Sequence, residues 1–182
     1  MMKRAMVVTD LDGTLFQRDR RASPENLRAL EELGARQVLR VIATGRNLFS
    51  VRNALPPAFP VDYVLFSSGA GCIAWESQEL LRAVSMNPAQ VFRAFAVLAA
   101  RGLDFMLHRP IPRDQHFRYY ASGRSNPDFE ARKALYAEFA RPGDHLIPPK
   151  GKACQFLAVE PPDAEPSAYE GLASELAGLT VI

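Results

Sequence analysis

The chain has 182 residues, 48% of them apolar, and carries a net charge of +2 with acids and bases interspersed. This length suits one domain or a core with a smaller second module, and the mixed charge gives no reason to expect binding to nucleic acid or to a membrane surface. No apolar run approaches the length of a signal peptide or a membrane span, and Cys72 and Cys154 imply neither a disulfide framework nor a metal site, so we expect a cytoplasmic protein with free thiols.

The first third of the chain alternates between strand and helix patterns. A short apolar run at residues 6–8 predicts a buried strand, and further strands are predicted at residues 38–43 and 63–66. Between them, one helix is predicted from Pro24 with Ser23 as its N-cap and Gly34 as its C-cap, and a more polar helix ends near Leu55. This order predicts an α/β fold with an open parallel sheet and right-handed crossovers.

After Gly71 the pattern predicts a different, α+β region, with a mainly antiparallel sheet. Its predicted elements are a hairpin at residues 72–84 turning at 77–79, helices at 87–102, 126–141 and 167–177, strands at 103–107, 117–121, 153–159 and 179–182, and a rigid proline-rich connector at 161–166. Phe92, Phe95 and Leu98 recur at helical spacing and are expected in the core. The histidines have no metal-like spacing and are expected at the surface. We place the boundary near Val84, which divides the chain into residues 1–84 and 85–182.

The residues that carry chemistry follow the first strand directly, in the segment Asp10-Leu11-Asp12-Gly13-Thr14. Side chains alternate along an extended segment, so Asp10 and Asp12 can face one crevice. One carboxylate can attack phosphorus while the other donates and accepts the proton. Two carboxylates beside a phosphate repel each other, and a bound Mg²⁺ would offset that repulsion. Gly13 permits the sharp turn that exposes backbone N–H groups.

Polar residues also follow the second and third strands. Thr44 can donate a hydrogen bond to a phosphoryl oxygen, or it can act only as a helix N-cap, and Gly45 lets a ligand approach. Arg46 can contact substrate or be solvated, and the residues leave both readings open. Since Asp10, Thr44 and Ser67 all end predicted parallel strands, we expect them to converge on one crevice.

Three segments together resemble the haloacid dehalogenase superfamily, and in particular its Cof-like branch of sugar-phosphate phosphatases. They are Asp10-Leu11-Asp12-Gly13-Thr14, Ile42-Ala43-Thr44-Gly45-Arg46 and Ser67-Ser68-Gly69-Ala70, the last with Ser68 where the branch has Asn. The resemblance implies a Rossmann-like core, with the region after residue 84 as an α+β cap of type C2. It implies that Asp10 is the nucleophile and Asp12 the acid/base, and that the Asp10 carboxylate and the Asp12 carbonyl bind Mg²⁺. It also implies a phosphate site at Leu11, Thr44, Gly45 and Arg46.

The family has two later motifs, one that supplies a Lys and one Gly-Asp-rich segment whose acid completes the Mg²⁺ site. Neither has a clear counterpart in this sequence. No Gly-Asp segment followed by a second acid occurs near the end, and Lys150-Gly151-Lys152 precedes what reads as a cap strand. We therefore expect that the chain stops within the cap, that it turns over poorly by itself, and that it self-associates or pairs with a missing C-terminal segment.

The sequence accordingly predicts a phosphoric monoester hydrolase that uses Mg²⁺ and an aspartyl-phosphate intermediate on a small phosphorylated metabolite. The alternative is a non-catalytic phosphate-binding or regulatory module, or an inactive fragment of such a phosphatase. A signalling receiver domain fits poorly, because the third predicted strand ends in Ser67-Ser68 rather than in an acid. A dinucleotide-binding domain fits worse, because no Gly-x-Gly-x-x-Gly follows the first strand.

Overall fold

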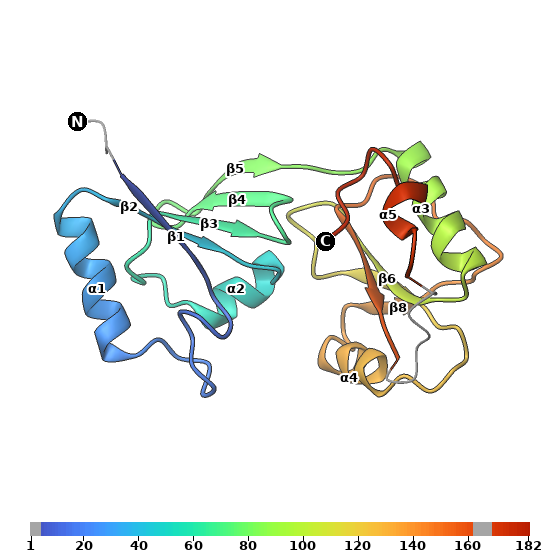
Figure 1. The fold of residues 1–182 in the computed structure, drawn as a ribbon, viewed down its shortest axis with the longest axis horizontal. Coiled ribbons are helices and arrows are strands. Elements are labelled where there is room, and N and C mark those ends of the chain that lie inside the picture. The colour runs from blue at the N-terminus through green and yellow to red at the C-terminus, as the bar shows by residue number, and fades with distance from the viewer. Residues whose placement is uncertain (1–4, 162–168) are drawn as a thin grey trace. The chain divides into compact units, whose positions relative to one another are not determined.

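The computed structural model describes residues 5–161 and 169–182. The chain divides into two compact units, Met1–Val84 and Ser85–Ile182 (Figure 1). Among the residues described, no helix has both the length and the apolar composition needed to cross a membrane.

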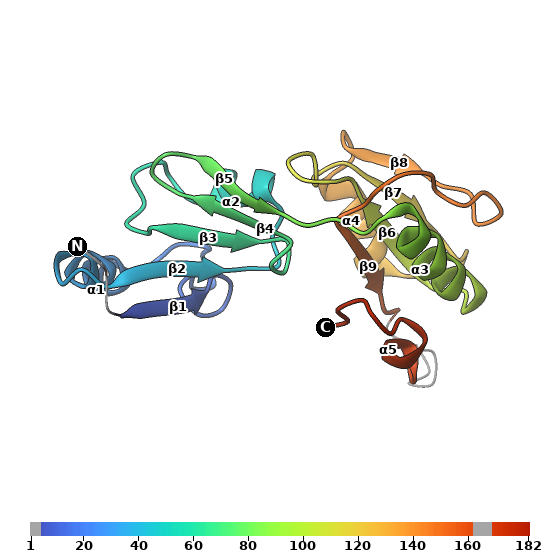
Figure 2. The same ribbon diagram turned by 90° about the horizontal axis from the view of Figure 1, so that it is seen from above.

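The first unit is built on a five-stranded sheet in the order β1-β2-β3-β4-β5 (Figure 2). Its elements are β1 (Met6–Asp10), α1 (Pro24–Ala35), β2 (Leu39–Ala43), α2 (Leu48–Ala54), β3 (Tyr63–Phe66), β4 (Gly71–Ala74) and β5 (Glu79–Ala83). Strands β1, β2 and β3 are parallel, and β4 and β5 add an antiparallel hairpin to the same sheet. Figure 1 shows α1 and α2 on the same side of this sheet. The predicted α/β class is confirmed, and the hairpin joins the core sheet.

Local capping determines where both helices of this unit begin. The Ser23 hydroxyl accepts from the N–H of Asn26 at 3.2 Å, and Pro24 occupies the first turn, as predicted. Helix α2 is capped by Asn47, whose Oδ1 accepts from the N–H of Ser50 at 2.8 Å. The reading of Thr44 as a helix N-cap is therefore wrong, because the chain runs three residues further before the helix starts.

The predicted C-cap role of Gly34 is also wrong. Helix α1 passes through Gly34 and is capped by Arg36, followed by Gln37 in the left-handed region at φ 61°. A Cβ at Gly34 would overlap the guanidinium of Arg40. That guanidinium is held by Asp62 through Nε–Oδ2 and Nη2–Oδ1 bonds of 3.1 and 3.2 Å. Glycine is thus needed there for close packing of a half-buried ion pair against the helix.

Strand β1 lies at the edge of the sheet, so the prediction of a buried strand needs correction. Met6, Val7 and Val8 are 59%, 38% and 50% exposed. The strand pairs with β2 alone among the residues that the structure describes. An apolar run of this kind is normally buried on both sides in a parallel sheet, whereas within the described ranges β1 has a neighbouring strand on one side only.

The second unit contains a four-stranded sheet in the order β8-β7-β6-β9. Its elements are α3 (Pro88–Ala100), β6 (Asp104–His108), β7 (Phe117–Tyr120), α4 (Pro127–Leu135), β8 (Ala140–Pro142), β9 (Gln155–Val159) and α5 (Leu172–Glu175). Strand β6 pairs antiparallel with β7 and β9, whereas β8 pairs parallel with β7. The α+β character is as predicted, but the parallel strand β8 was not.

Several predicted elements of this unit were too long. The helix expected at 126–141 ends at Leu135, and part of the remainder forms β8. Of the helix expected at 167–177, only Leu172–Glu175 is helical among the described residues, and the strand expected at 179–182 is not formed. The first two residues of that helix and most of the proline connector, residues 162–166, lie outside the described ranges. The β4–β5 turn uses residues 75–78 rather than 77–79.

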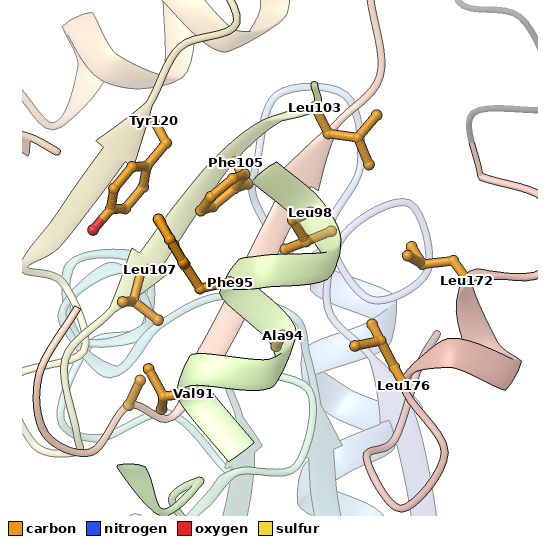
Figure 3. Close-up of a cluster of buried hydrophobic side chains, with 11 residues drawn as sticks. Val91, Ala94, Phe95, Leu98, Leu103, Phe105, Leu107, Tyr120, Leu172 and Leu176 are labelled. Carbon is orange, nitrogen blue, oxygen red and sulfur yellow. The ribbon is translucent and has the colours of Figure 1, made fainter. Parts of the chain in front are cut away.

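The two faces of the second sheet carry different helices. Helices α3 and α5 pack on one face, where Phe95 meets Phe105 and Tyr120 edge to face at 5.9 and 5.2 Å between ring centroids (Figure 3). On the other face, Phe129 of α4 packs with residues of β6, β7 and β9. The prediction that Phe92 is a core residue is wrong, since its side chain is 54% exposed.

The sequence suggested that His108 lies at the surface, but this residue is half-buried. It lies on β6, and its Nδ1 donates to the carbonyl oxygen of Asp114 at 2.8 Å. A carbonyl can only accept, so this bond selects the tautomer with hydrogen on Nδ1. Burial is the main cause that lowers the pKa of His108 from its ordinary value of 6.5.

Candidate active site

The carboxyl ends of β1, β2 and β3 meet at one edge of the first sheet, because the three strands are parallel. Asp10 ends β1 opposite Ala43 of β2, and Thr44 and Ser67 follow β2 and β3 directly. The loops after β2 and β3 are joined by hydrogen bonds from the N–H of Ser67 to the carbonyl of Arg46 (2.8 Å) and from Ser68 to Thr44 (3.2 Å). The expected convergence of polar strand ends is therefore present for these two loops.

The loop after β1 turns tightly back on the strand. The N–H of Leu15 donates to the carbonyl of Asp10 at 3.3 Å, and that of Phe16 to Leu11 at 2.7 Å. Gly13 adopts φ +79°, a left-handed conformation that glycine enters without a steric penalty. Leu11 is fully buried while Asp10 and Asp12 are exposed. Two exposed acids thus flank a buried residue, as the expected alternation implies, and that both acids face one crevice stays a prediction.

Arg46 binds the carboxylate of Asp12 with two parallel hydrogen bonds. The Nε–Oδ2 distance is 2.7 Å and the Nη2–Oδ1 distance is 2.6 Å. The Arg46 side chain is 19% exposed and that of Asp12 is 51% exposed. The guanidinium carbon also lies 5.9 Å from the centre of the buried Phe16 ring. A fork of this kind is among the strongest and most directional ion pairs available to a protein.

Thr44 and Gly45 connect β2 to this arginine. The Thr44 side chain is buried, and its hydroxyl oxygen accepts from the N–H of Arg46 at 3.2 Å. The hydroxyl hydrogen remains a donor, so Thr44 keeps the capacity to bind an anion. Gly45 is exposed, and a Cβ there would make only an ordinary contact with Ser68 at 3.7 Å. The chain's own packing therefore does not require glycine at position 45.

The β3–β4 loop holds an unusual backbone conformation beside this site. Ser67 and Ser68 have φ 48° and 51°, and Gly69 follows at φ 87°. Non-glycine residues rarely enter this region, and such strain is often found at functional sites. The N–H groups of Ser67 and Ser68 are the donors to the β2 loop described above, so the strained turn positions the Thr44–Arg46 segment.

A site for a divalent cation would consist here of few protein ligands. In the described part of the chain, no group of three or more His, Cys, Asp or Glu side chains is placed to hold a metal ion. The Asp10 carboxylate is exposed, and its Oδ1 accepts from the N–H of Leu11 at 2.8 Å. This exposed carboxylate is a suitable ligand for Mg²⁺, which binds through one or two carboxylates and keeps several waters.

The predicted residues are thus only partly joined by direct contacts. Asp12, Arg46 and Thr44 form one connected group, while the Asp10 carboxylate bonds to its own neighbour Leu11. Sequence reasoning missed the Asp12–Arg46 pair and the Phe16 ring beside it. The partners lie 34 residues apart, and no local periodicity could have indicated that contact.

Comparison with known proteins places these observations in a family. A family model described as haloacid dehalogenase-like hydrolase matches residues 7–177. No curated protein matches the chain by sequence. The solved structures that resemble it include a haloacid dehalogenase-like hydrolase from Bacteroides thetaiotaomicron, with 21% identity and a TM-score of 0.61 over 94% of this chain and 62% of that one.

Two further structures are described as phosphatases. BT1666 from Bacteroides thetaiotaomicron, a phosphatase of the same superfamily, has 25% identity and a TM-score of 0.54 over 77% of this chain and 49% of that one. BT4131, a HAD subclass IIB sugar phosphatase, has 16% identity and a TM-score of 0.63 over 94% of this chain and 63% of that one. The chain thus spans less than two thirds of the length of these three proteins. Because the family model covers most of the sequence, the chain belongs to the haloacid dehalogenase-like hydrolase family.

Proposed function

We propose that this chain carries the phosphoryl-accepting part of a Mg²⁺-dependent phosphatase that acts on a small phosphate monoester. The observation that carries the proposal is the exposed Asp10 carboxylate at the carboxyl end of β1, at the same sheet edge as Thr44 and Arg46. A nucleophile, a hydroxyl donor and a guanidinium at one edge are the groups that phosphoryl transfer needs.

The proposed reaction has two steps with Asp10 as nucleophile. A carboxylate oxygen of Asp10 attacks phosphorus, the bond from phosphorus to the ester oxygen breaks, and Asp12 gives a proton to the leaving oxygen. Water then attacks the phosphorus of the aspartyl phosphate and gives a proton to Asp12, while the bond from phosphorus to the Asp10 oxygen breaks, which frees the Asp10 carboxylate and releases phosphate. Leu11, Thr44, Gly45 and Arg46 would bind the phosphoryl oxygens. Mg²⁺, held by the Asp10 carboxylate and the Asp12 carbonyl, would offset the charge of the phosphate.

A sugar phosphate or a related small metabolite is the proposed substrate class. The family match supports a hydrolase, and one similar structure is that of a sugar phosphatase. The second unit, residues 85–182, is proposed to act as a type C2 cap that selects the substrate. We propose a cytoplasmic location, which the free thiols of Cys72 and Cys154 support.

A second candidate is a phosphate-binding module without turnover. It is favoured by the fork between Arg46 and Asp12, which engages both oxygens of the proposed acid/base. In this alternative, phosphate would bind at the sheet edge but no aspartyl phosphate would form.

Beryllofluoride trapping distinguishes the two candidates without requiring turnover. The chain is incubated with Mg²⁺ and beryllofluoride, and the adduct is located by ¹⁹F NMR and crystallography. We expect it on Asp10 and expect it to be absent in Asp10→Asn, because an amide is a poor nucleophile and loses the charge that attracts the cation. Asp19→Asn, an exposed acid of the next loop, is the control and should retain the adduct.

An adduct on another residue, or one that persists in Asp10→Asn, would reject Asp10 as the nucleophile. Phosphate binding without any adduct would favour the binding module instead.

A further inference from the structure

If the proposed function holds, the Arg46 side chain must divide its hydrogen bonds between Asp12 and the substrate. Both Asp12 oxygens accept short, charge-assisted bonds from this guanidinium. A leaving-group oxygen must therefore compete with Arg46 for either oxygen of Asp12. The arrangement suits a substrate-free site better than one in which Asp12 faces an ester.

The backbone of Arg46 is anchored at both its N–H and its carbonyl. The N–H donates to the Thr44 hydroxyl at 3.2 Å, and the carbonyl accepts from the N–H of Ser67 at 2.8 Å. Any change of partner must therefore come from rotation of the Arg46 side chain alone. Such rotamer changes need no rearrangement of the sheet.

A phosphoryl group offers Arg46 the same geometry as Asp12 does. The planar guanidinium fork matches carboxylate and phosphate alike, and both bonds gain from opposite charge. The Asp12 side is half exposed, so an anion in solution can reach the pair. The bonds that Arg46 gives up on leaving Asp12 are therefore replaced by bonds of the same kind to the phosphoryl group.

We infer that Arg46 exchanges partners during binding: it holds the Asp12 carboxylate in the substrate-free site and transfers to the phosphoryl oxygens when a phosphate ester binds, which releases Asp12 toward the leaving group. This inference rests on the proposed phosphatase function and deepens it. It makes Arg46 both a positioning residue for Asp12 and a ligand of the substrate. The competing description is a permanent clamp, in which Arg46 stays on Asp12 throughout.

A double-mutant cycle on the affinity for inorganic phosphate tests the exchange without turnover. Isothermal titration of the full chain is carried out at neutral pH in metal-free buffer with wild type, D12N, R46Q and the double variant. Exchange predicts that D12N tightens phosphate binding by about three- to tenfold, because Arg46 no longer has to release the charged Asp12 carboxylate. In the R46Q background, D12N should change the phosphate affinity by less than about twofold, because only its effect on the net charge near the phosphate remains.

R18Q is the matched control, because it removes one exposed arginine from the loop that follows Asp12. It should leave both affinities almost unchanged. The Nε–H resonance of Arg46 gives a second readout that does not depend on a variant at that position. Exchange predicts that it shifts on adding phosphate to wild type, and that D12N shifts it before any phosphate is added.

An equal effect of D12N in both backgrounds, or an Arg46 resonance unmoved by bound phosphate, would support the permanent clamp and overturn the exchange. Failure of D12N to bind phosphate would overturn it as well. If that failure came with a beryllofluoride adduct on Asp10, the proposed function would stand and the exchange alone would fall. Absence of both the adduct and phosphate binding would reject the proposed function itself.

Discussion

At the scale of single residues, the two acids of the site differ in what holds them. Asp10 accepts one hydrogen bond from the adjacent N–H of Leu11, whereas Asp12 is gripped at both oxygens by Arg46. A residue that must attack needs an accessible oxygen, and a residue that must transfer a proton needs a defined orientation. The contact of Asp10 therefore suits the attack proposed for it, whereas Asp12 can serve a leaving group only after Arg46 releases one of its oxygens.

Asp12→Ala is expected to slow the hydrolysis of phosphate esters by about 10²- to 10⁴-fold, which is the usual contribution of general acid/base catalysis. The loss should be smaller for aryl phosphates with good leaving groups, because these need less protonation. Steady-state rates over a leaving-group series measure this, with Asp19→Ala as a control in the same loop between β1 and α1. Equal losses across the series would mean that Asp12 only shapes the turn.

His108 gives the second unit a predictable dependence on pH. Its pKa in the folded chain lies below 6.5, chiefly because of burial, and the Asp114 contacts oppose this only in part. As the pH falls below 6.5, the unfolded chain takes up a proton before the folded chain does. The free energy of unfolding should therefore decrease from pH 6.5 down to the lowered pKa and then stop changing on account of this group.

Hydrogen exchange of the β6 amides at pH 7.5 and 5.5 measures this dependence. Tryptophan fluorescence would not measure it, because the one tryptophan, Trp75, lies in the first unit. His108→Gln should flatten the part of the pH dependence that lies near 6.5. His116, on the loop before β7, provides the matched His116→Gln control. An unchanged slope in His108→Gln would show that another group titrates there.

At the scale of elements, one buried polar cluster connects four segments of the second unit. Asp104 of β6 accepts from the N–H of Ser122 and from Nδ2 of Asn126, at 2.5 and 2.9 Å. The same Nδ2 donates to the carbonyl of Val159 in β9, and Oδ1 of Asn126 caps α4 through the N–H of Phe129. Burying a carboxylate removes it from water, which costs free energy. Here that cost is offset because both oxygens of Asp104 accept hydrogen bonds.

Asn126→Ala should lower the free energy of unfolding by roughly 3 kcal/mol, because it removes a helix cap and leaves a buried carboxylate short of a donor. Urea unfolding followed by circular dichroism measures the change. Asn87→Ala, at the exposed cap of α3, is the control and should cost about 1 kcal/mol. Equal losses for the two variants would mean that the Asp104 contact contributes nothing beyond capping.

At the scale of the whole molecule, the outer edge of β1 is the main surface that no other described strand covers. Its backbone groups on the side away from β2 face no strand among the described residues, and the side chains of Met6, Val7 and Val8 are exposed. An exposed edge strand with an apolar run such as residues 6–8 is a template for pairing with another strand. The solution behaviour of the chain should reflect this edge.

We expect the chain to self-associate in a concentration-dependent manner, and Val8→Lys to shift it toward the monomer by placing a charge on the edge strand. Sedimentation velocity between low and high micromolar concentration measures this. Phe92→Lys, which removes an exposed aromatic residue from α3, should leave the association unchanged. A monomer at all concentrations, or equal effects of the two variants, would mean that β1 is not the contact.

The sequence by itself determined the order of elements in the first unit and predicted which strand ends carry the candidate site. Caps such as Ser23 act over three residues, and apolar runs such as residues 63–66 reflect burial along one segment, so both are visible in the sequence. The placement of Asp10 and Asp12 on the solvent side of Leu11 followed from alternation along an extended chain.

Only the tertiary structure decided which distant groups meet. The fork between Arg46 and Asp12, the packing of Arg40 against Gly34 and the parallel pairing of β8 with β7 depend on segments that folding brings together. Contacts between remote segments follow from the packing of the whole sheet, which no local pattern encodes.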